Sequence, residues 1–180
     1  MIFGLERHFF VDPEYYAQET ERIFSRNWIC LGRAEALTQP GTARAFELGP
    51  YSIVVVRDKK NSYSAFHNVC RHRGTRLLDS SCQDSPLKND CITCPYHAWT
   101  YNLDGTLRGA PAMNQNEGFC KSDYKLPDVR CQEWLGWVFV TLNADAPDVA
   151  DQLSKVEDLV GDYDMTNYTQ TFSETHRWNT

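Results

Sequence analysis

Two short motifs, Cys70-x-His72 and Cys94-x-x-His97, contain the residues best suited to bind a metal. Together they supply two thiolates and two imidazoles, which can hold a [2Fe–2S] cluster with two cysteines on one iron and two histidines on the other. Structural zinc sites also use two cysteines and two histidines. Zinc fingers, however, place both cysteines in one half of the motif, whereas each half here carries one of each. The arrangement therefore favours an iron–sulfur cluster over zinc.

A count of formal charges indicates what this ligand set would do. Two ferric ions and two bridging sulfides carry a net charge of about +2, which two thiolates bring to about zero and four thiolates would bring to about −2. Adding an electron is therefore easier with mixed ligands than with four cysteines. The sequence predicts an electron-transfer module.

The residues around the motifs carry a family resemblance. Residues 66–77 read FHNVCRHRGTRL and residues 94–99 read CPYHAW. This resembles the cluster loops in the large (alpha) subunits of Rieske non-haem iron oxygenases, the ring-hydroxylating and N-demethylating family. The resemblance implies that Cys70, His72, Cys94 and His97 bind a Rieske [2Fe–2S] cluster. The stretch between the motifs is longer than is usual in the family, and its polar run 79–90 is expected to be a surface loop.

The resemblance implies an oxygenase component. Such a component takes electrons from a reductase or ferredoxin and passes them to a mononuclear iron for O₂-dependent hydroxylation or demethylation, in a homotrimer or larger assembly. Two histidines and one carboxylate hold that iron in a separate catalytic domain. Outside the cluster motifs the chain has only His8, His67 and His176. We therefore expect the catalytic domain and its mononuclear Fe(II) to be missing, and the chain alone to lack oxygenase activity.

Two alternatives remain for function. A stand-alone Rieske-type ferredoxin would carry electrons by itself, but such carriers are usually shorter and lack an N-terminal helix and a tail after Pro147. A zinc-stabilised binding module is disfavoured by the ligand order. Within the oxygenase family, residues 66–99 resemble the choline, betaine and carnitine branch as much as the aromatic one, so the substrate stays open.

Composition excludes several other classes. The net charge of −6 and pI of about 5.3 argue against a nucleic-acid module. The longest apolar run, residues 134–142, is too short to span a membrane, and the N-terminus does not read as a signal peptide. Seven cysteines, an odd number without a secretion signal, predict reduced thiols and a cytoplasmic protein.

The remaining cysteines are interpreted as ordinary thiols. Cys91 and Cys94 form a C-x-x-C that could be a redox pair, but Cys94 is already assigned to iron. A Cys82–Cys91 bridge across the polar run is disfavoured in a reducing compartment. By resemblance, respiratory Rieske proteins join the two cluster loops with a disulfide. Here the corresponding residues are Thr75 and Tyr96, which places the chain with the oxygenase type, toward the low end of the roughly −150 to +300 mV Rieske range.

The pattern along the chain predicts a mainly β fold: an antiparallel Rieske β-sandwich or small barrel with the cluster loops at one tip, plus N-terminal and C-terminal helices. Asp12-Pro13 is expected to begin a helix to about residue 25. Further predictions are strands at 28–31, 43–48, 52–57, 63–68, 129–134 and 137–142, a hairpin at 99–107, a helix at 149–161 and a strand at 165–180. The predicted domains are 1–37 (N-terminal helix and lead-in), 38–146 (Rieske domain) and 147–180 (start of a truncated catalytic domain).

Several neighbours of the ligands have predicted roles. Gly74 is expected to adopt a tight or positive-φ conformation. Arg71 and Arg73 could stabilise a reduced cluster, stay solvated, or pair with carboxylates of the absent domain. Tyr96 and Trp99 could shield or hydrogen-bond the cluster, or simply pack beneath the loops.

Overall fold

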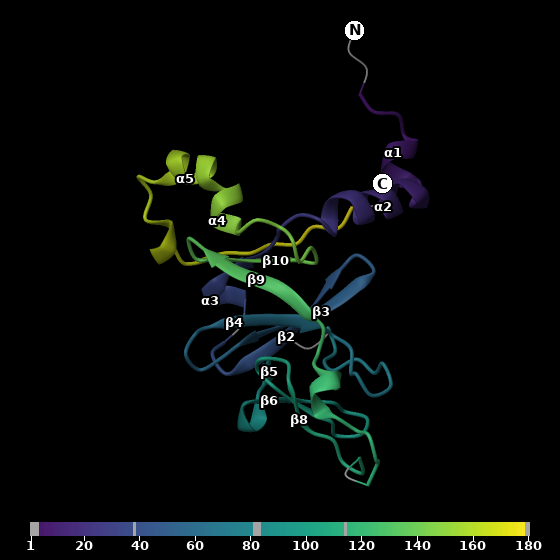
Figure 1. The fold of residues 1–180 in the computed structure, drawn as a ribbon. Coiled ribbons are helices and arrows are strands. Elements are labelled where there is room, and N and C mark those ends of the chain that lie inside the picture. Colours follow the sequence, from purple (N-terminus) through teal and green to yellow (C-terminus); the bar gives the residue numbers. More distant parts are fainter. Residues whose placement is uncertain (1–3, 38, 81–83, 114, 179–180) are drawn as a thin grey trace.

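The computed structural model describes residues 4–37, 39–80, 84–113 and 115–178, and its core is two antiparallel sheets (Figure 1). The larger sheet has the strand order β1-β10-β9-β4-β3-β2-β5. Its strands are β1 (Ile29–Arg33), β2 (Thr42–Leu48), β3 (Tyr51–Arg57), β4 (Tyr63–His67), β5 (Ser85–Pro86), β9 (Asp128–Trp134) and β10 (Trp137–Thr141). The smaller sheet consists of β6 (Cys91–Thr93), β7 (Thr100–Asn102) and β8 (Leu107–Gly109). The predicted mainly β, antiparallel fold is confirmed.

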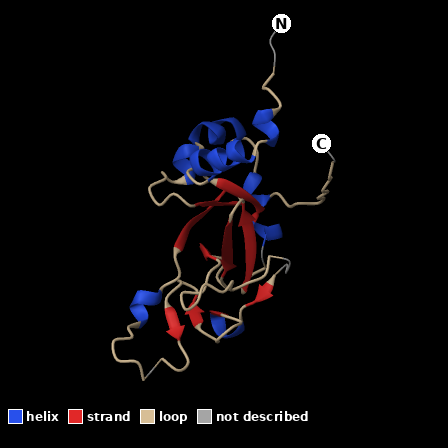
Figure 2. Ribbon diagram, turned by 90° about the vertical axis from the view of Figure 1, so that its right-hand side faces the viewer, coloured by secondary structure: helices blue, strands red, loops and turns tan. Residues whose placement is uncertain are grey.

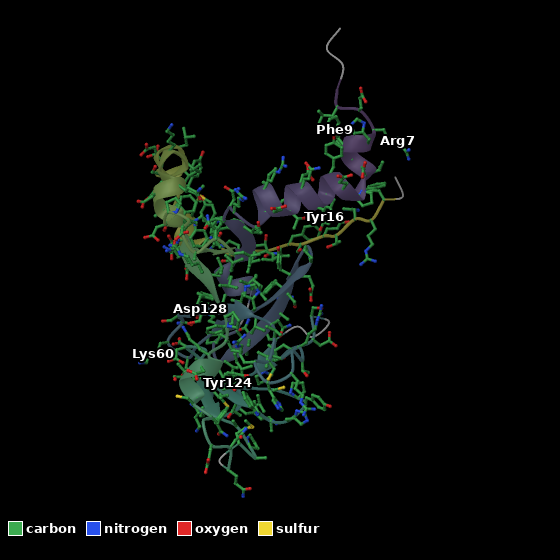
Figure 3. The ribbon with its side chains drawn as sticks, turned by 45° about the vertical axis from the view of Figure 1, so that its right-hand side comes forward. Arg7, Phe9, Tyr16, Lys60, Tyr124 and Asp128 are labelled. Carbon is green, nitrogen blue, oxygen red and sulfur yellow. The ribbon has the colours of Figure 1, made fainter. Side chains whose placement is uncertain are left out.

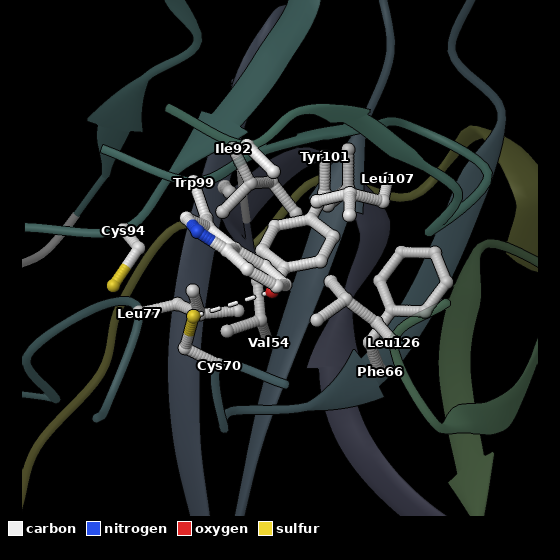
Figure 4. Close-up of a cluster of buried hydrophobic side chains, with 13 residues drawn as sticks. Val54, Phe66, Cys70, Leu77, Ile92, Cys94, Trp99, Tyr101, Leu107 and Leu126 are labelled. Carbon is white, nitrogen blue, oxygen red and sulfur yellow. Dashed lines mark hydrogen bonds between the residues drawn. The ribbon is translucent and has the colours of Figure 1, made fainter. Parts of the chain in front are cut away.

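Strand β3 is buried on both faces, which explains its run of β-branched residues. Ile53 and Val55 face one apolar cluster together with Val140, and Val54 and Val56 face another. The second cluster fills the space between the two sheets, where Figure 4 shows its side chains packed together. The smaller sheet is thereby attached to the larger one through a shared core.

The helices gather at the end of the molecule opposite the smaller sheet (Figures 1 and 2). They are α1 (His8–Val11), α2 (Pro13–Glu19) with its π-helical continuation η1 (Thr20–Phe24), α4 (Val149–Gln152) and α5 (Ser154–Val160), while α3 (Ala34–Leu37) follows β1. Short 3-10 turns lie at η2 (Lys88–Asp90), η3 (Lys121–Tyr124) and η4 (Met165–Asn167). No helix of the described residues is long and apolar enough to cross a membrane.

The predicted N-terminal helix is confirmed, including its start. The Asp12 carboxylate accepts the Glu14 backbone N–H at 2.9 Å, as an N-cap should. Tyr16 points from α2 toward the turn between β2 and β3 (Figure 3). Its hydroxyl lies 3.0 Å from where a Cβ on Gly49 would be, and Gly49 has φ +60°, so both the close contact and the backbone conformation favour glycine there.

The predicted C-terminal helix is confirmed in two pieces, with a break at Leu153. The predicted strand at 165–180 is wrong over its described part. It begins as the turn η4, and residues 168–178 then run in no regular structure. Threonine and aromatic residues favour a strand only when a neighbouring strand supplies hydrogen bonds. Here several of the backbone carbonyls bond to an arginine side chain instead.

The described part of the polar run between the motifs contains more regular structure than a plain surface loop. Strand β5 pairs with β2 through Thr42↔Pro86 and Ala43↔Ser85, and the turn η2 follows. Cys82, one end of the disfavoured bridge, lies outside the described residues. Cys91 has a free thiol that donates to the Lys88 carbonyl at 3.1 Å.

Candidate metal centre

The first motif lies in a tight turn within loop 1 (residues 68–78), which follows β4. The Cys70 N–H donates to the Thr75 carbonyl at 2.8 Å, and the Gly74 N–H donates back to the Cys70 carbonyl at 3.0 Å. Gly74 has φ +71°, as predicted from its place beside the ligands. The turn brings Cys70 inward and leaves His72 nearer the surface.

The second motif lies in loop 2 (residues 93–100), between β6 and β7, and repeats the same pattern. The Cys94 N–H donates to the Trp99 carbonyl at 2.8 Å, and the Ala98 N–H donates to the Cys94 carbonyl at 3.1 Å. The residue equivalent to Gly74 is Ala98, which also has positive φ, +57°. The Thr93↔Thr100 pair of the smaller sheet closes the base of this loop.

The two candidate imidazoles face each other. The Nδ1 atoms of His72 and His97 lie 3.1 Å apart. Two nitrogens each about 2.1 Å from one tetrahedral metal would be about 3.4 Å apart, so the observed spacing fits a shared metal. The His72 ring stacks on Trp99 with 4.7 Å between centroids and 6° between planes, while the His97 ring lies 3.7 Å from that of Tyr96.

The two candidate thiols are buried. Cys70 and Cys94 are 2% and 3% exposed, and Figure 4 shows both sulfur atoms beside Trp99, on the side away from Phe66. Burial raises the pKa of the Cys94 thiol, and the neighbouring Cys70 raises it further. Two such thiols, once deprotonated, need a positive charge between them, and a bound metal would supply it.

Tyr101 of β7 is the aromatic hydroxyl that reaches a candidate ligand. It is fully buried, lies 3.2 Å from the Cys70 sulfur and accepts the Arg71 N–H at 3.1 Å. Burial and the neighbouring Cys70 raise the pKa of Tyr101, which keeps the hydroxyl protonated. Facing a Cys70 thiolate it must donate the hydrogen bond. Tyr96 is the tyrosine that the sequence suggested for this role, but its side chain is 59% exposed.

Asn68, like Tyr101, supports the candidate site and was not singled out from the sequence. Its side chain is buried at the start of loop 1. The amide oxygen accepts the Leu77 and Leu78 N–H groups at 3.0 Å each, and the amide nitrogen donates to the Leu78 carbonyl at 2.7 Å. Its nitrogen also lies 3.1 Å from the Ser52 hydroxyl of β3. A polar residue at the end of a predicted strand, directly before a ligand motif, was the available signal.

The charge around the imidazoles suits metal binding. Burial, together with the neighbouring His97 and Arg73, lowers the pKa of His72, which favours the neutral ring that a metal requires. Arg71 and Arg73 are both exposed. Trp99 is 1% exposed and stacks on His72, as the packing alternative predicts.

The other three histidines lie elsewhere. His8 in α1 is 3.3 Å from Glu6, and His176 in the tail is 3.1 Å from Glu174. His67 sits in β4, and burial lowers its pKa. Within the described ranges, no group of three or more His, Cys, Asp or Glu side chains is arranged so that it could hold one metal ion. The four candidate ligands instead form one pair of imidazoles and one pair of thiols.

Two sheets carrying paired Cys/His loops define a Rieske-type iron–sulfur domain. The chain belongs to the Rieske [2Fe–2S] domain family, whose model matches residues 27–132. The family's [2Fe–2S] cluster confirms the cofactor predicted from the sequence, and the resemblance to Rieske oxygenases is confirmed by the relatives described below.

Similar proteins include oxygenase subunits. The chain is 37% identical over 145 residues to the carnitine monooxygenase oxygenase subunit of Acinetobacter pittii, covering 81% of this chain and 38% of that protein. It is 35% identical over 164 residues to the glycine betaine monooxygenase oxygenase subunit of Chromohalobacter salexigens, covering 91% and 36%. The apo crystal structure of the quaternary ammonium Rieske monooxygenase CntA superposes with a TM-score of 0.78 at 33% identity, covering 88% of this chain and 45% of CntA. The chain thus spans less than half the length of each of these relatives.

Proposed function

We propose that this chain is the electron-relay module of a Rieske oxygenase. In this proposal Cys70 and Cys94 bind one iron of the cluster, and His72 and His97 bind the other. The observation that carries the proposal is the pairing of imidazole Nδ1 atoms at 3.1 Å beside two buried thiols. When bound, the cluster takes up and releases one electron.

The chain's own residues hold and tune this site. Tyr101 donates a hydrogen bond to the Cys70 sulfur, which stabilises extra negative charge there. Trp99 covers the inner side of His72 and excludes water. The imidazoles are nearer the surface than the thiols, so a redox partner would approach on the histidine side.

The partners follow from the oxygenase class. A reductase or ferredoxin would supply electrons, and a mononuclear iron, bound by two histidines and a carboxylate, would receive them for O₂-dependent hydroxylation or demethylation. The relatives' additional length would provide this catalytic domain, within a homotrimer or larger assembly. The division into 1–37, 38–146 and 147–180 belongs to the same proposal, and so does a cytoplasmic location, which rests on the cysteine count.

The matched region supports a relay role, but it does not indicate a substrate. Relatives at similar identity include enzymes named for carnitine, for glycine betaine and, at 32% identity, for biphenyl. A stand-alone ferredoxin is the alternative, since it would use the same cluster site. It would pass its electron to a separate protein instead of to a mononuclear iron within its own oxygenase assembly.

The ligand assignment is tested by reconstitution and substitution. Protein reconstituted with iron and sulfide should be red-brown, with two irons and two sulfides expected per chain for a [2Fe–2S] site, and on reduction should give the low-average-g EPR signal of nitrogen ligation. Cys70→Ser and Cys94→Ser should lose the visible spectrum. Cys91→Ser is the matched control, because Cys91 is also buried and lies three residues from Cys94.

Two results would contradict the assignment. One is stoichiometric zinc without labile sulfide. The other is loss of the cluster in Cys91→Ser with its retention in Cys94→Ser.

The relay role is tested by activity. The 180-residue chain should be reduced by dithionite but should oxidise no substrate. A chain extended to the length of its relatives should gain O₂-dependent turnover. If the extended chain only passes electrons to a separate acceptor, the ferredoxin alternative is correct.

A further inference from the structure

Arg33, at the end of β1, is a buried charge whose hydrogen bonds run mostly to one distant segment. The residue is 6% exposed. Its guanidinium donates to the Met165 carbonyl at 2.8 Å, to the Thr166 carbonyl at 3.4 Å, and to the Tyr168 carbonyl. A fourth bond, to the Leu135 carbonyl at 3.1 Å, fixes it to the turn between β9 and β10. Three of its four backbone acceptors therefore belong to residues 165–168.

Glu35 completes the arrangement from the opposite side. It pairs with Arg33 at 3.2 Å and accepts the Gln170 N–H at 3.0 Å. The Trp137 ring supports the guanidinium, with 5.4 Å from the guanidinium carbon to the ring centroid. A Cβ on Gly136 would lie 2.6 Å from the guanidinium, and Gly136 has φ +78°, so this position leaves room for the arginine only as glycine. We call this group of four residues the Arg33–Glu35 socket.

The segment held by the socket has little other support. Tyr168 is 52% exposed and Phe172 is 74% exposed. Among the described residues the segment after η4 forms no strand. The buried guanidinium needs these carbonyl acceptors, because an unpaired buried charge is costly. The segment in turn needs the guanidinium donors to hold its backbone in place. Segment and socket should therefore order each other.

We propose that the Arg33–Glu35 socket is the binding site for residues 165–170 and fixes the direction in which the chain leaves the Rieske domain. The socket is part of the larger sheet, since the Ala34 N–H donates to the Gly136 carbonyl at 2.9 Å. Figure 1 shows the yellow exit segment running along the β10 side of that sheet. Arg33 and Glu35 are positioning residues in this inference, which does not depend on the cluster ligands or on the relay role.

Amide hydrogen exchange in the full chain tests the proposal. The Gln170 amide is a direct reporter, because its hydrogen bond ends on Glu35. Glu35→Ala should abolish its protection, whereas Glu35→Gln should retain most of it through the remaining side-chain oxygen. Arg33→Ala should also raise exchange throughout residues 163–170, with peptides from β3 and β4 unchanged.

Arg130→Ala is the matched control. Arg130 is a second arginine that holds a loop by its carbonyls, donating to Ala146 and pairing with Asp148 at 2.7 Å. Its loss should expose residues 144–149 and leave the Gln170 amide protected. If Arg33→Ala fails to fold, Glu35→Ala decides the question alone. Wild-type protection of the Gln170 amide in Glu35→Ala would overturn the proposal.

A distance measurement gives a second readout of direction. With Cys30, Cys82 and Cys120 replaced by serine, a nitroxide at Ser173→Cys can be paired with a second nitroxide at Ser62→Cys, next to β4. Pulsed EPR should give a narrow distance distribution in this background and a broad one when Arg33→Ala is added. Equal widths in the two proteins would show that the socket does not set the exit direction.

Discussion

Loop 1 and loop 2 share a backbone pattern but are supported differently. In each loop the backbone carbonyl of the candidate ligand cysteine accepts an N–H from four residues ahead, and its N–H donates to a carbonyl five residues ahead. Loop 2 is closed by strand pairing between β6 and β7. Loop 1 has no such hairpin, and the side chain of Asn68 closes it instead.

Side chains from the loop 2 side also support the ligands of loop 1. Trp99 stacks on His72, and Tyr101 contacts the Cys70 sulfur. By contrast, the ring stacked on His97 is that of the exposed Tyr96, which belongs to loop 2 itself. Loop 2 is thus a scaffold on which loop 1 depends. Near-identical backbone turns can therefore have very different sensitivities to mutation.

The largest expected effect is from Trp99→Ala. Removing a fully buried indole that also supports His72 should cost about 3–5 kcal/mol of unfolding free energy and should impair cluster retention. Tyr96→Ala, on an exposed ring, should stay within about 0.5 kcal/mol. Urea unfolding of the two variants measures this. Equal losses would mean that loop 1 does not depend on the loop 2 scaffold.

Asn68→Ala should have the next largest effect. It leaves two N–H groups and one carbonyl of loop 1 without their partners, at a cost of about 2–3 kcal/mol. Asn102→Ala is the control, because Asn102 also bonds by its side chain, to Thr106 at 2.8 Å, but at an exposed site. Its cost should be below about 1 kcal/mol. Urea midpoints at constant m-value compare them, and similar midpoints would refute the special role of Asn68.

Tyr101→Phe should change the cluster more than the fold. Loss of the hydrogen bond to the Cys70 sulfur should destabilise the reduced state relative to the oxidised state by about 1 kcal/mol. This lowers a one-electron potential by roughly 40 mV. Tyr96→Phe should leave the potential unchanged. Spectroelectrochemical titration of the two variants checks this, and an unchanged potential in Tyr101→Phe would show that the hydroxyl does not tune the cluster.

Exchanging the residues at the equivalent positive-φ positions compares the two turns directly. Ala98→Gly should stabilise the protein by about 0.5–1 kcal/mol, because an L-residue is strained there. Gly74→Ala should destabilise by about 1 kcal/mol through φ alone, since no heavy atom lies within 4 Å of the added Cβ. Thermal unfolding measures both, and effects of the same sign would contradict this explanation.

The smallest effect at neutral pH concerns Cys131, a partly buried thiol outside the loops. Burial, with Glu133 nearby, raises the pKa of Cys131 to about 12, above its ordinary value of 9.0. Between these values the folded state keeps a proton that the unfolded state loses. The contribution of this thiol to the free energy of unfolding is therefore fully present below pH 9 and is lost as pH rises toward 12. Cys131→Ala should flatten this alkaline decline in urea midpoints. An unchanged slope would mean that Cys131 titrates normally.

Much of this protein could be predicted from its sequence. The C-x-H and C-x-x-H motifs indicated the metal-binding chemistry because ligand type and local spacing are sequence properties. Asp12-Pro13 predicted a helix start, and the β-branched residues of 52–57 predicted a strand. Each of these rests on contacts within a few residues of the chain, which a sequence displays directly.

The errors and omissions involve contacts between distant segments. Residues 165–178 have strand-forming composition but form no strand, and Arg33 binds their first carbonyls from more than 130 positions away in the sequence. Tyr101 and Tyr96 both follow Cys94 closely, and only packing decides which hydroxyl meets Cys70. Asn68 reads as the last residue of a predicted strand, and its role in closing loop 1 is visible only when β4 and loop 1 are seen together.

The sequence by itself therefore predicted the candidate ligand set and determined the cofactor class and the β character of the fold. The tertiary structure alone decided which side chains support those ligands and where the chain leaves the domain. The reason is physical: local spacing fixes which groups are available, but a hydrogen bond or ring contact between segments exists only when folding brings them within a few ångströms.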